Sequence, residues 1–317
     1  NANSYYLLDQ PSFVQAEVRR GDVVLAATGF PEAPFDAAVS DYRVQKVRRF
    51  SFQRPFIEVY RMTPDSQTWR SDPAAAFEKV ALVQTDGKRL LARGVGVPEF
   101  AQVAPIRSVV SGKLVPQAVA TYWKDRSMTN VGDKLKGFPE EELAAKPSQE
   151  AQEFVSEPET TEETAYDPQT PFALSTREYR ILDLGTNLTG FLGATVTCSE
   201  KTKLWFLFDE LLTDGDVKFN RLGCACVVSF ELEPGTYHLE SIEPYTLRYW
   251  KIACVEGKCE IHDAYLREYT HPGMPATFAS SNPRLDKLFR AGVETFRQNT
   301  LDVFMDCPSR ERAGWLC

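Results

Sequence analysis

The sequence lacks the marks of several common protein classes. No run of apolar residues approaches the roughly 20 that a membrane-spanning helix needs, and the longest, such as Leu204–Phe208, have the length of a strand. The three histidines show no i, i+4 metal spacing, and there is neither a glycine-rich phosphate loop nor a G-x-S-x-G elbow. These absences argue against a membrane-spanning protein, a P-loop nucleotide-binding protein and an elbow-type serine hydrolase. No metal or cofactor is expected.

The first residues, Asn1 to Ser4, contain neither the basic nor the apolar region of a signal peptide. A leader removed earlier would leave the same sequence. Localisation therefore stays open, with a periplasmic or secreted location preferred to a cytoplasmic one.

The acidic character of the chain is confined to one segment. The net charge is −8, yet residues 139–170 hold ten Asp and Glu residues against the single Lys146, so the rest of the chain is nearly neutral. The one basic cluster, between Arg43 and Arg54, is interleaved with valines and phenylalanines, which is typical of a half-buried strand with a solvated face. No basic stripe is present, so no nucleic-acid partner is predicted.

Seven cysteines make an odd number for a disulfide framework. They stand at positions 198, 224, 226, 254, 259, 307 and 317. Neither Cys224-Ala225-Cys226 nor the pair Cys254 and Cys259 matches the paired C-x-x-C spacing of a zinc site. Buried free thiols that behave as small hydrophobes are the preferred interpretation. A disulfide between Cys254 and Cys259 across a tight turn is the alternative.

The first half of the chain is predicted to contain a β-rich domain and a connection. In residues 1–115, short apolar runs alternate with turn formers, a spacing that is typical of an antiparallel sandwich. The expected strands are Val23–Ala27, Arg43–Phe52, Phe56–Met62, Val80–Gln84 and Arg89–Arg93. Residues 116–172 are acidic and contain several prolines, so we interpret them as a linker or insertion without chemistry of its own.

Residues 173–275 predict a second β-sandwich, of the jelly-roll kind. The expected strands are Arg180–Leu184, Gly190–Cys198, Leu204–Phe208, Cys226–Leu232, Tyr237–Ile242, Tyr249–Val255 and Ile261–Tyr269. Asp214-Gly215-Asp216 is a turn signal. Trp123, Trp205 and Trp250 are the aromatic candidates for a sugar-binding platform, although Trp205 and Trp250 fall in expected strands and are better explained as core.

The hydrophobic period changes in residues 276–317. Asn282 and Pro283 supply a helix cap and a first helical residue, and apolar residues from Leu285 to Phe296 recur at i, i+3, i+4 and i+7. A long helix is therefore predicted directly before the segment Asp302 to Cys317, which combines acids, arginines and a tryptophan.

This final segment has two interpretations. A charged turn around Pro308, with Arg310 and Arg312 neutralising the acids, is one. The other is a sugar-cleaving site, because such sites need carboxylates, hydroxyl-binding donors and an aromatic wall for the apolar face of a sugar. All three kinds of residue lie within ten positions here.

Inverting α-L-rhamnosidases carry a signature that closely resembles Asp306-Cys307-Pro308-x-Arg310-Glu311-Arg312-x-Gly314-Trp315. Three upstream segments are similar to family segments in the same order, namely Asp183-Leu184-Gly185-Thr186-Asn187-Leu188-Thr189-Gly190, Thr246-Leu247-Arg248-Tyr249 and Phe278-x-x-Ser281-x-x-x-Leu285-Asp286-x-Leu288. The resemblance covers residues 173–317 and is weak before them. It departs from the family at Thr246-Leu247, where Gly-Phe is usual, and at Asp286, where asparagine is usual.

The resemblance implies a mainly β chain of two sandwich domains followed by the first helix of a truncated α/α toroid catalytic domain. It implies hydrolysis of terminal α-L-rhamnosyl linkages in a rhamnose-containing oligosaccharide, polysaccharide or glycoside. Glu311 would be the general acid, and Asp306, Arg310 and Trp315 would bind the sugar. The family's general base would lie outside this chain, so the chain alone is expected to be inactive. A non-catalytic carbohydrate-binding module and a toroid-fold glycosidase for another sugar remain the alternatives.

Overall fold

A computed structural model describes most of the chain, and in it the chain is mainly β, as predicted. The described residues are 14–28, 35, 37–72, 74–75, 77, 92, 94–124, 136–273, 276–301 and 304–312. Trp315, the strand expected at Val80–Gln84 and most of the one at Arg89–Arg93 lie outside these residues. Among the described residues, no helix combines the length and the apolar character needed to cross a bilayer.

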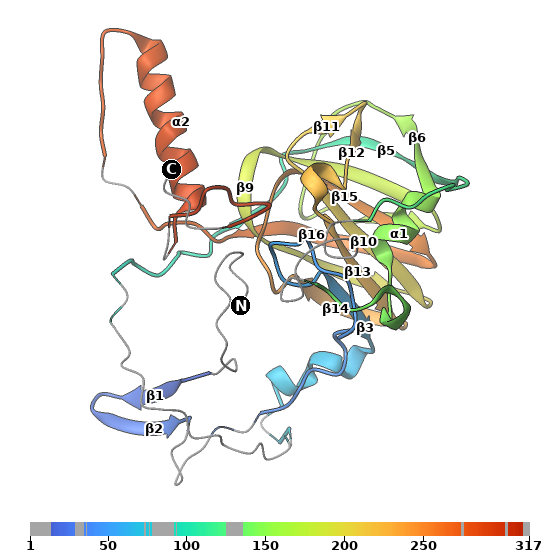
Figure 1. The fold of residues 1–317 in the computed structure, drawn as a ribbon, viewed down its shortest axis with the longest axis horizontal. Helices are drawn as coiled ribbons and strands as arrows, with labels where there is room; N and C mark the ends of the chain where they lie inside the picture. The colour runs from blue at the N-terminus through green and yellow to red at the C-terminus, as the bar shows by residue number, and fades with distance from the viewer. Residues whose placement is uncertain are drawn as a thin grey trace.

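The strands are β1 (Glu17–Arg20), β2 (Val23–Ala27), β3 (Glu58–Met62), β4 (Gln102–Val103), β5 (Arg107–Pro116), β6 (Phe154–Thr160), β7 (Thr164–Ala165), β8 (Phe172–Ser175), β9 (Glu178–Cys198), β10 (Thr202–Asp209), β11 (Leu212–Thr213), β12 (Asp216–Val217), β13 (Val227–Leu232), β14 (Gly235–Glu240), β15 (Tyr245–Glu256) and β16 (Lys258–Glu268). The helices are α1 (Pro147–Glu150) and α2 (Pro283–Asn299), and short 3-10 turns span Pro64–Arg70, Glu140–Glu142, Ala151–Glu153 and Arg221–Gly223. Helix α2 stands to one side of the sheet (Figure 1).

Strand β9 organises the sheet because it belongs to two layers. Its first part pairs with β15 on one side and β5 on the other, and its last part pairs with β14 and β16. The first layer runs β3-β13-β10-β15-β9-β5, and the second joins β14, β9, β16 and β8. Within the first part, between Asp183 and Leu188, the pairing with β15 is interrupted, and Gly185 there has φ +82°, a left-handed conformation that glycine adopts without strain.

The core lies between these layers and is rich in aromatic side chains. The ring of Phe206 packs edge-on against Trp250 at 4.8 Å and against Phe230 at 4.9 Å, measured between ring centroids. Each of these fully buried rings contributes roughly 2 to 3 kcal/mol of hydrophobic stabilisation. Trp205 and Trp250 are both buried, as expected of core residues, and Trp205 packs against Phe154 on the face of β10 opposite to Phe206.

Local sequence signals predicted several elements well. The strand expected at Val23–Ala27 is β2, and the apolar runs of residues 173–275 fall in β9, β10 and β13 to β16. Asp214 and Gly215 both have positive φ, at 52° and 80°, so they form the two-residue turn of the β11–β12 hairpin. Helix α2 begins at Pro283, and the side chain of Asn282 accepts a hydrogen bond from the Arg284 N–H.

The prediction of a solvated basic strand between Arg43 and Phe52 is wrong. Residues 43–52 form only isolated bridges, and Arg48 and Arg54 are buried. The physical reason is that the guanidinium groups stack on aromatic rings, since Arg48 lies 4.6 Å from the Trp123 ring centroid and Arg54 lies 4.4 Å from that of Phe50.

The sheet takes strands from the first three of the four expected regions. β3 from the first region pairs with β13, and β5 pairs with both β6 and β9. The expected boundary at residues 115/116 falls at the end of β5, and α1, β6 and β7 lie in the segment expected as a linker. The division into residues 1–115, 116–172, 173–275 and 276–317 stays a prediction.

The six cysteines in the described part of the chain are free thiols, in agreement with the preferred interpretation. Five of them, at positions 198, 224, 226, 254 and 259, are buried. Cys307 is partly exposed. The Cys254 thiol donates to the carbonyl oxygen of Glu256 at 3.4 Å.

A buried carboxylate joins two of the family-like segments. Asp183 accepts hydrogen bonds from Arg107 Nε at 2.9 Å, from Arg248 Nε at 2.8 Å and from the Gly185 N–H at 2.7 Å. Burial alone would raise the pKa of Asp183, but the hydrogen bonds from Arg248, Gly185 and Arg107 hold it below its ordinary value. Asp183 therefore ties β9 to β5 and β15.

Replacing Asp183 tests this connection. Asp183→Asn is expected to lower the free energy of unfolding by about 2 to 3 kcal/mol, because two guanidinium groups lose their common counter-charge. Chemical denaturation measures the difference. Because the folded-state pKa of Asp183 is lowered, the wild-type advantage is present at neutral pH and is lost as the pH falls below about 4.

The matched control is Asp214→Asn, at an exposed left-handed turn position that asparagine also tolerates. It should change stability by less than about 0.5 kcal/mol. Equal stabilities of Asp183→Asn and the wild type at pH 7 would show that the carboxylate charge is dispensable.

Candidate functional site

The family-like motif forms a turn that rests on the sandwich. Residues Pro308 to Glu311 are the turn itself, Asp306 precedes it and is exposed, and Arg310 and Glu311 are partly buried. Trp315, the fourth predicted site residue, lies outside the described residues. Three of the four candidates are thus placed on one short segment.

Side chains from distant parts of the sandwich hold the backbone of this turn. Arg54 Nη1 donates to the Ser309 carbonyl oxygen at 2.8 Å, and Ser51 Oγ donates to that of Arg310 at 3.2 Å. Thr246 Oγ1 donates to the Pro308 carbonyl oxygen at 3.1 Å. The turn is therefore fixed by groups that lie up to 259 residues away in the sequence.

Thr246 links the separate family-like segments. Its hydroxyl lies 2.9 Å from that of Thr189 in β9, and both threonines are buried. The Thr189 N–H donates to Gln298 Oε1 of α2 at 2.7 Å. A chain of three hydrogen bonds therefore links β9, β15, α2 and the motif turn.

Arg312 closes the turn from the other side. Its Nε donates to the Pro308 carbonyl oxygen at 2.8 Å, and its Nη2 donates to the Pro244 carbonyl oxygen. Burial, with the neighbouring Arg54 as the second cause, lowers the pKa of Arg312 to about 9. Glu243, 3.7 Å from Arg54 and 4.0 Å from Arg312, partly compensates the two positive charges.

The loop that supports both arginines is held by Glu58, which is fully buried. Its two oxygens accept hydrogen bonds from the N–H groups of Ile242 at 2.7 Å and Glu243 at 2.9 Å, and from the hydroxyls of Tyr60 and Tyr245. Burial raises the pKa of Glu58, against the opposing effect of these hydrogen bonds. Glu58 thereby holds the backbone of residues 242–243, directly before Pro244.

Glu311 and Arg310 form the chemical part of the turn. Arg310 Nη2 donates to Glu311 Oε1 at 2.6 Å, and the Glu311 side chain is only 13% exposed. The Glu311 N–H points to Cys307 Sγ at 3.4 Å. A carboxyl group in this position can give or take a proton, while the guanidinium retains further N–H donors for a ligand.

Helix α2 is anchored at its C-terminal end and exposes the N-terminal part of its apolar face. Arg297 donates to Thr270 Oγ1 at 2.7 Å and to Glu268 at 2.8 Å. Leu285 and Leu288, on the apolar stripe, are 46% and 69% exposed. The N-terminal part of the stripe is therefore available for packing, whereas Phe289 already stacks on Phe278 and Phe296 packs on Phe304.

Sequence reasoning missed the supporting residues. Ser51, Arg54 and Glu58 belong to residues 1–115, to which no role at the site was assigned. Their types are ordinary, and no local pattern shows that their partners lie near residues 242–246 and 308–312.

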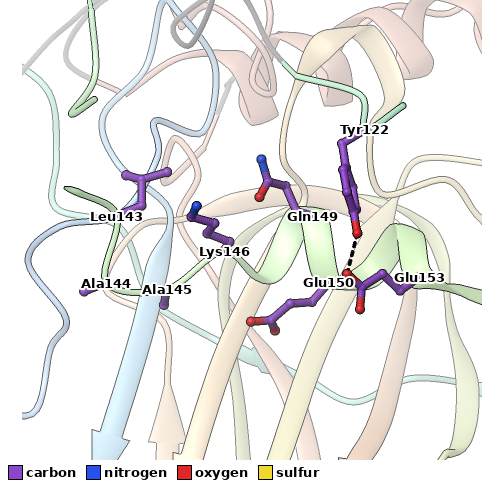
Figure 2. Close-up of a pocket in the computed structure, with 8 residues that line it drawn as sticks. All are labelled: Tyr122, Leu143, Ala144, Ala145, Lys146, Gln149, Glu150 and Glu153. Atoms are coloured by element: carbon purple, nitrogen blue, oxygen red, sulfur yellow. Dashed lines mark hydrogen bonds between the residues drawn. The ribbon is translucent and has the colours of Figure 1, made fainter. Parts of the chain in front are cut away.

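No group of three or more His, Cys, Asp and Glu side chains suited to a metal ion occurs in the described part of the chain. An open cavity of about 360 Å³ lies beside α1 (Figure 2), and no residue of the motif turn lines it. Its lining residues are Tyr122, Leu143, Ala144, Ala145, Lys146, Gln149, Glu150 and Glu153. Tyr122 donates to Glu153 at 2.6 Å and Lys203 to Glu150 at 2.6 Å, so its acids are paired within the protein.

Comparisons with known proteins give a family match and several structural likenesses. Residues 274–317 match the family model of the bacterial alpha-L-rhamnosidase six-hairpin glycosidase domain. A search of the curated proteins found no match.

Among solved structures, a GH78 family rhamnosidase of Bacillus sp. GL1 is 19% identical with a TM-score of 0.43, over 52% of this chain and 18% of that one. A rhamnosidase from Klebsiella oxytoca with rhamnose bound is 16% identical with a TM-score of 0.42, over 66% and 38%. The Streptomyces avermitilis alpha-L-rhamnosidase complexed with L-rhamnose is 18% identical with a TM-score of 0.34, over 64% and 21%. The match spans less than two fifths of each of these structures. For residues 274–317, the family model confirms the resemblance to bacterial α-L-rhamnosidases that the motifs predict.

The support of the turn by Glu58 leads to a prediction. Glu58→Gln is expected to lower the free energy of unfolding by about 2 kcal/mol. The Ile242 and Glu243 N–H groups bind different carboxylate oxygens of Glu58. In either orientation, the side-chain NH₂ of the glutamine would therefore face one of these two N–H groups, and a donor would meet a donor. Hydrogen exchange should become faster at residues 241–246 and 308–312.

Glu141→Gln, at an exposed position, is the matched control and should leave both measurements unchanged. Faster exchange at residues 241–246 alone, without a change at the motif turn, would disprove the mechanical link between Glu58 and the turn.

Proposed function

We propose that this protein is a glycoside hydrolase that removes terminal α-L-rhamnosyl units by an inverting general acid/base mechanism. The observation that carries the proposal is the position of Glu311. It lies in the segment matched by the rhamnosidase family model, next to Arg310, on a turn fixed by the sandwich.

Glu311 is the general acid of this mechanism. It gives its proton to the glycosidic oxygen as the bond to the rhamnosyl carbon breaks, so the leaving alcohol departs neutral. The low exposure of the Glu311 side chain supports this role, because it limits competition from water. The contact with Arg310 fixes the orientation of the carboxyl group.

Asp306, Arg310 and Trp315 form the sugar-binding part. Arg310 donates to ring hydroxyls, Asp306 accepts from them, and Trp315 stacks on the apolar face of the sugar. An inverting enzyme also needs a base that activates water from the opposite face, with the carboxyl groups about 6.5 to 9.5 Å apart. Residues outside this chain supply that base.

The apolar face of α2 fits a toroid of helical hairpins. Leu285 and Leu288 lie one turn apart on the same side of the helix, and both are exposed. Further helices of the catalytic domain cover this stripe, since a helix with such a face is stable when the face is packed.

The role of Glu311 is tested in the full-length protein with aryl α-L-rhamnosides. Glu311→Gln should lower kcat by roughly 10²- to 10⁴-fold on a substrate with a poor leaving group, because the amide cannot protonate the departing oxygen. The loss should be much smaller with dinitrophenolate, which departs without a proton. Steady-state kinetics on both substrates measure the difference.

Glu141→Gln serves again as the exposed control and should keep wild-type kinetics. An equal loss on both substrates would remove Glu311 as the acid. Turnover of another aryl glycoside in preference to the rhamnoside would favour the toroid-fold glycosidase for a different sugar.

A further inference from the structure

The Pro308 carbonyl oxygen is bonded from two sides. It accepts hydrogen bonds from Thr246 Oγ1 of β15 at 3.1 Å and from Arg312 Nε at 2.8 Å. Pro308 is the first residue of the motif turn and Glu311 the last, and the Glu311 N–H points back to Cys307 Sγ. A displacement of the Pro308 carbonyl group would therefore shift the short segment that carries the Glu311 carboxyl group.

Thr246 differs from the other anchors of the turn in the element that carries it. Ser51 and Arg54 belong to the irregular segment before β3, and Arg312 directly follows the turn itself. Thr246 lies in β15, where its backbone pairs with Thr189 of β9. A side chain on a paired strand is placed more accurately than one on a loop. The bond from Thr246 therefore fixes the turn relative to the sheet.

The two threonine hydroxyls form a chain that has one direction. A hydroxyl has a single proton to donate, and a carbonyl oxygen can only accept. Because Thr246 donates to Pro308, the 2.9 Å contact between the hydroxyls requires Thr189 as the donor. Both threonines are buried, which limits replacement of these bonds by water. In such a chain the Thr189 hydroxyl polarises that of Thr246 and strengthens its bond to the turn.

We propose that Thr246 is a positioning residue for the general acid of this protein. It acts through the Pro308 carbonyl group and does not itself touch the substrate. Glycine is usual at this position in the family segment that resembles residues 246–249, and glycine has no side chain that could donate, so the anchor belongs to this chain. The inference rests on the proposed function, because it takes Glu311 as the proton donor.

The test uses the full-length protein with the two kinds of aryl α-L-rhamnoside. Thr246→Val, which removes the hydroxyl at similar volume, should lower kcat about tenfold on the substrate with the poor leaving group, because the proton donor is misplaced. The loss should be smaller, about threefold or less, on the dinitrophenyl rhamnoside, whose leaving group needs no proton. Thr246→Ser retains the donor and should recover kcat to within about twofold of the wild type.

Two further variants separate positioning from a general loss of stability. Thr189→Val leaves the Thr246 donor in place and should lower kcat less than Thr246→Val does. Thr236→Val is the matched control, because it breaks another pair of threonine hydroxyls, 3.2 Å apart, between β14 and β9. It should keep wild-type kinetics. Thermal unfolding checks that each variant is folded.

Hydrogen exchange gives a measurement that does not depend on turnover. Thr246→Val should exchange faster than the wild type at residues 309–312, and Thr236→Val should not.

Three results would overturn the inference, namely an equal loss on both substrates in Thr246→Val, no recovery in Thr246→Ser, and unchanged exchange at residues 309–312 in Thr246→Val. Failure of the proposed function has a different signature. If the wild type does not cleave the rhamnosides, or if Glu311→Gln loses equally on both, the hydrolase proposal falls and the catalytic role of Thr246 falls with it. Faster exchange in Thr246→Val would then still identify Thr246 as an anchor of the turn.

Discussion

The motif turn depends on the hydrogen bonds that Arg54 and Arg312 make to backbone carbonyl oxygens. Arg54 reaches Ser309, and Arg312 reaches both Pro308 and Pro244. A guanidinium group with several fixed N–H donors suits this task, since it can bind carbonyl oxygens of two separate backbone segments at once. The two positive charges are brought together at a cost that Glu243 and the aromatic ring of Phe50 reduce.

The sandwich serves as the rigid base for this arrangement. Its two layers share β9, and Asp183 connects β9 with β5 and β15 through two arginines. β15 then carries Thr246 and Tyr245 to the motif turn and to Glu58. Side chains on ordered strands are placed more accurately than side chains on loops. A proton donor on a turn, such as Glu311, would require supporting side chains that are placed in this way.

Features determined by neighbouring residues could be predicted from the sequence. The cap at Asn282 with Pro283, the left-handed pair Asp214-Gly215 and the strand Val23–Ala27 each follow from local chemistry. The motif from Asp306 to Glu311 was also recognisable, since its residues are contiguous.

Features determined by distant residues could not be predicted. The buried state of Arg48 depends on Trp123, and that of Arg54 on carbonyl groups near residues 244 and 309. A run of arginines and apolar residues therefore suggested a solvated strand although its guanidinium groups are buried. Glu58 is similar, because its role follows only from the loop at residues 242–243 that it meets in space.

The central claim is that the turn held by the sandwich is half of an inverting glycosidase site. The stereochemistry of the first product tests it most directly. Proton NMR of the full-length protein acting on an aryl α-L-rhamnoside should show β-L-rhamnose first, before mutarotation produces the α form. Initial release of α-L-rhamnose would contradict the account.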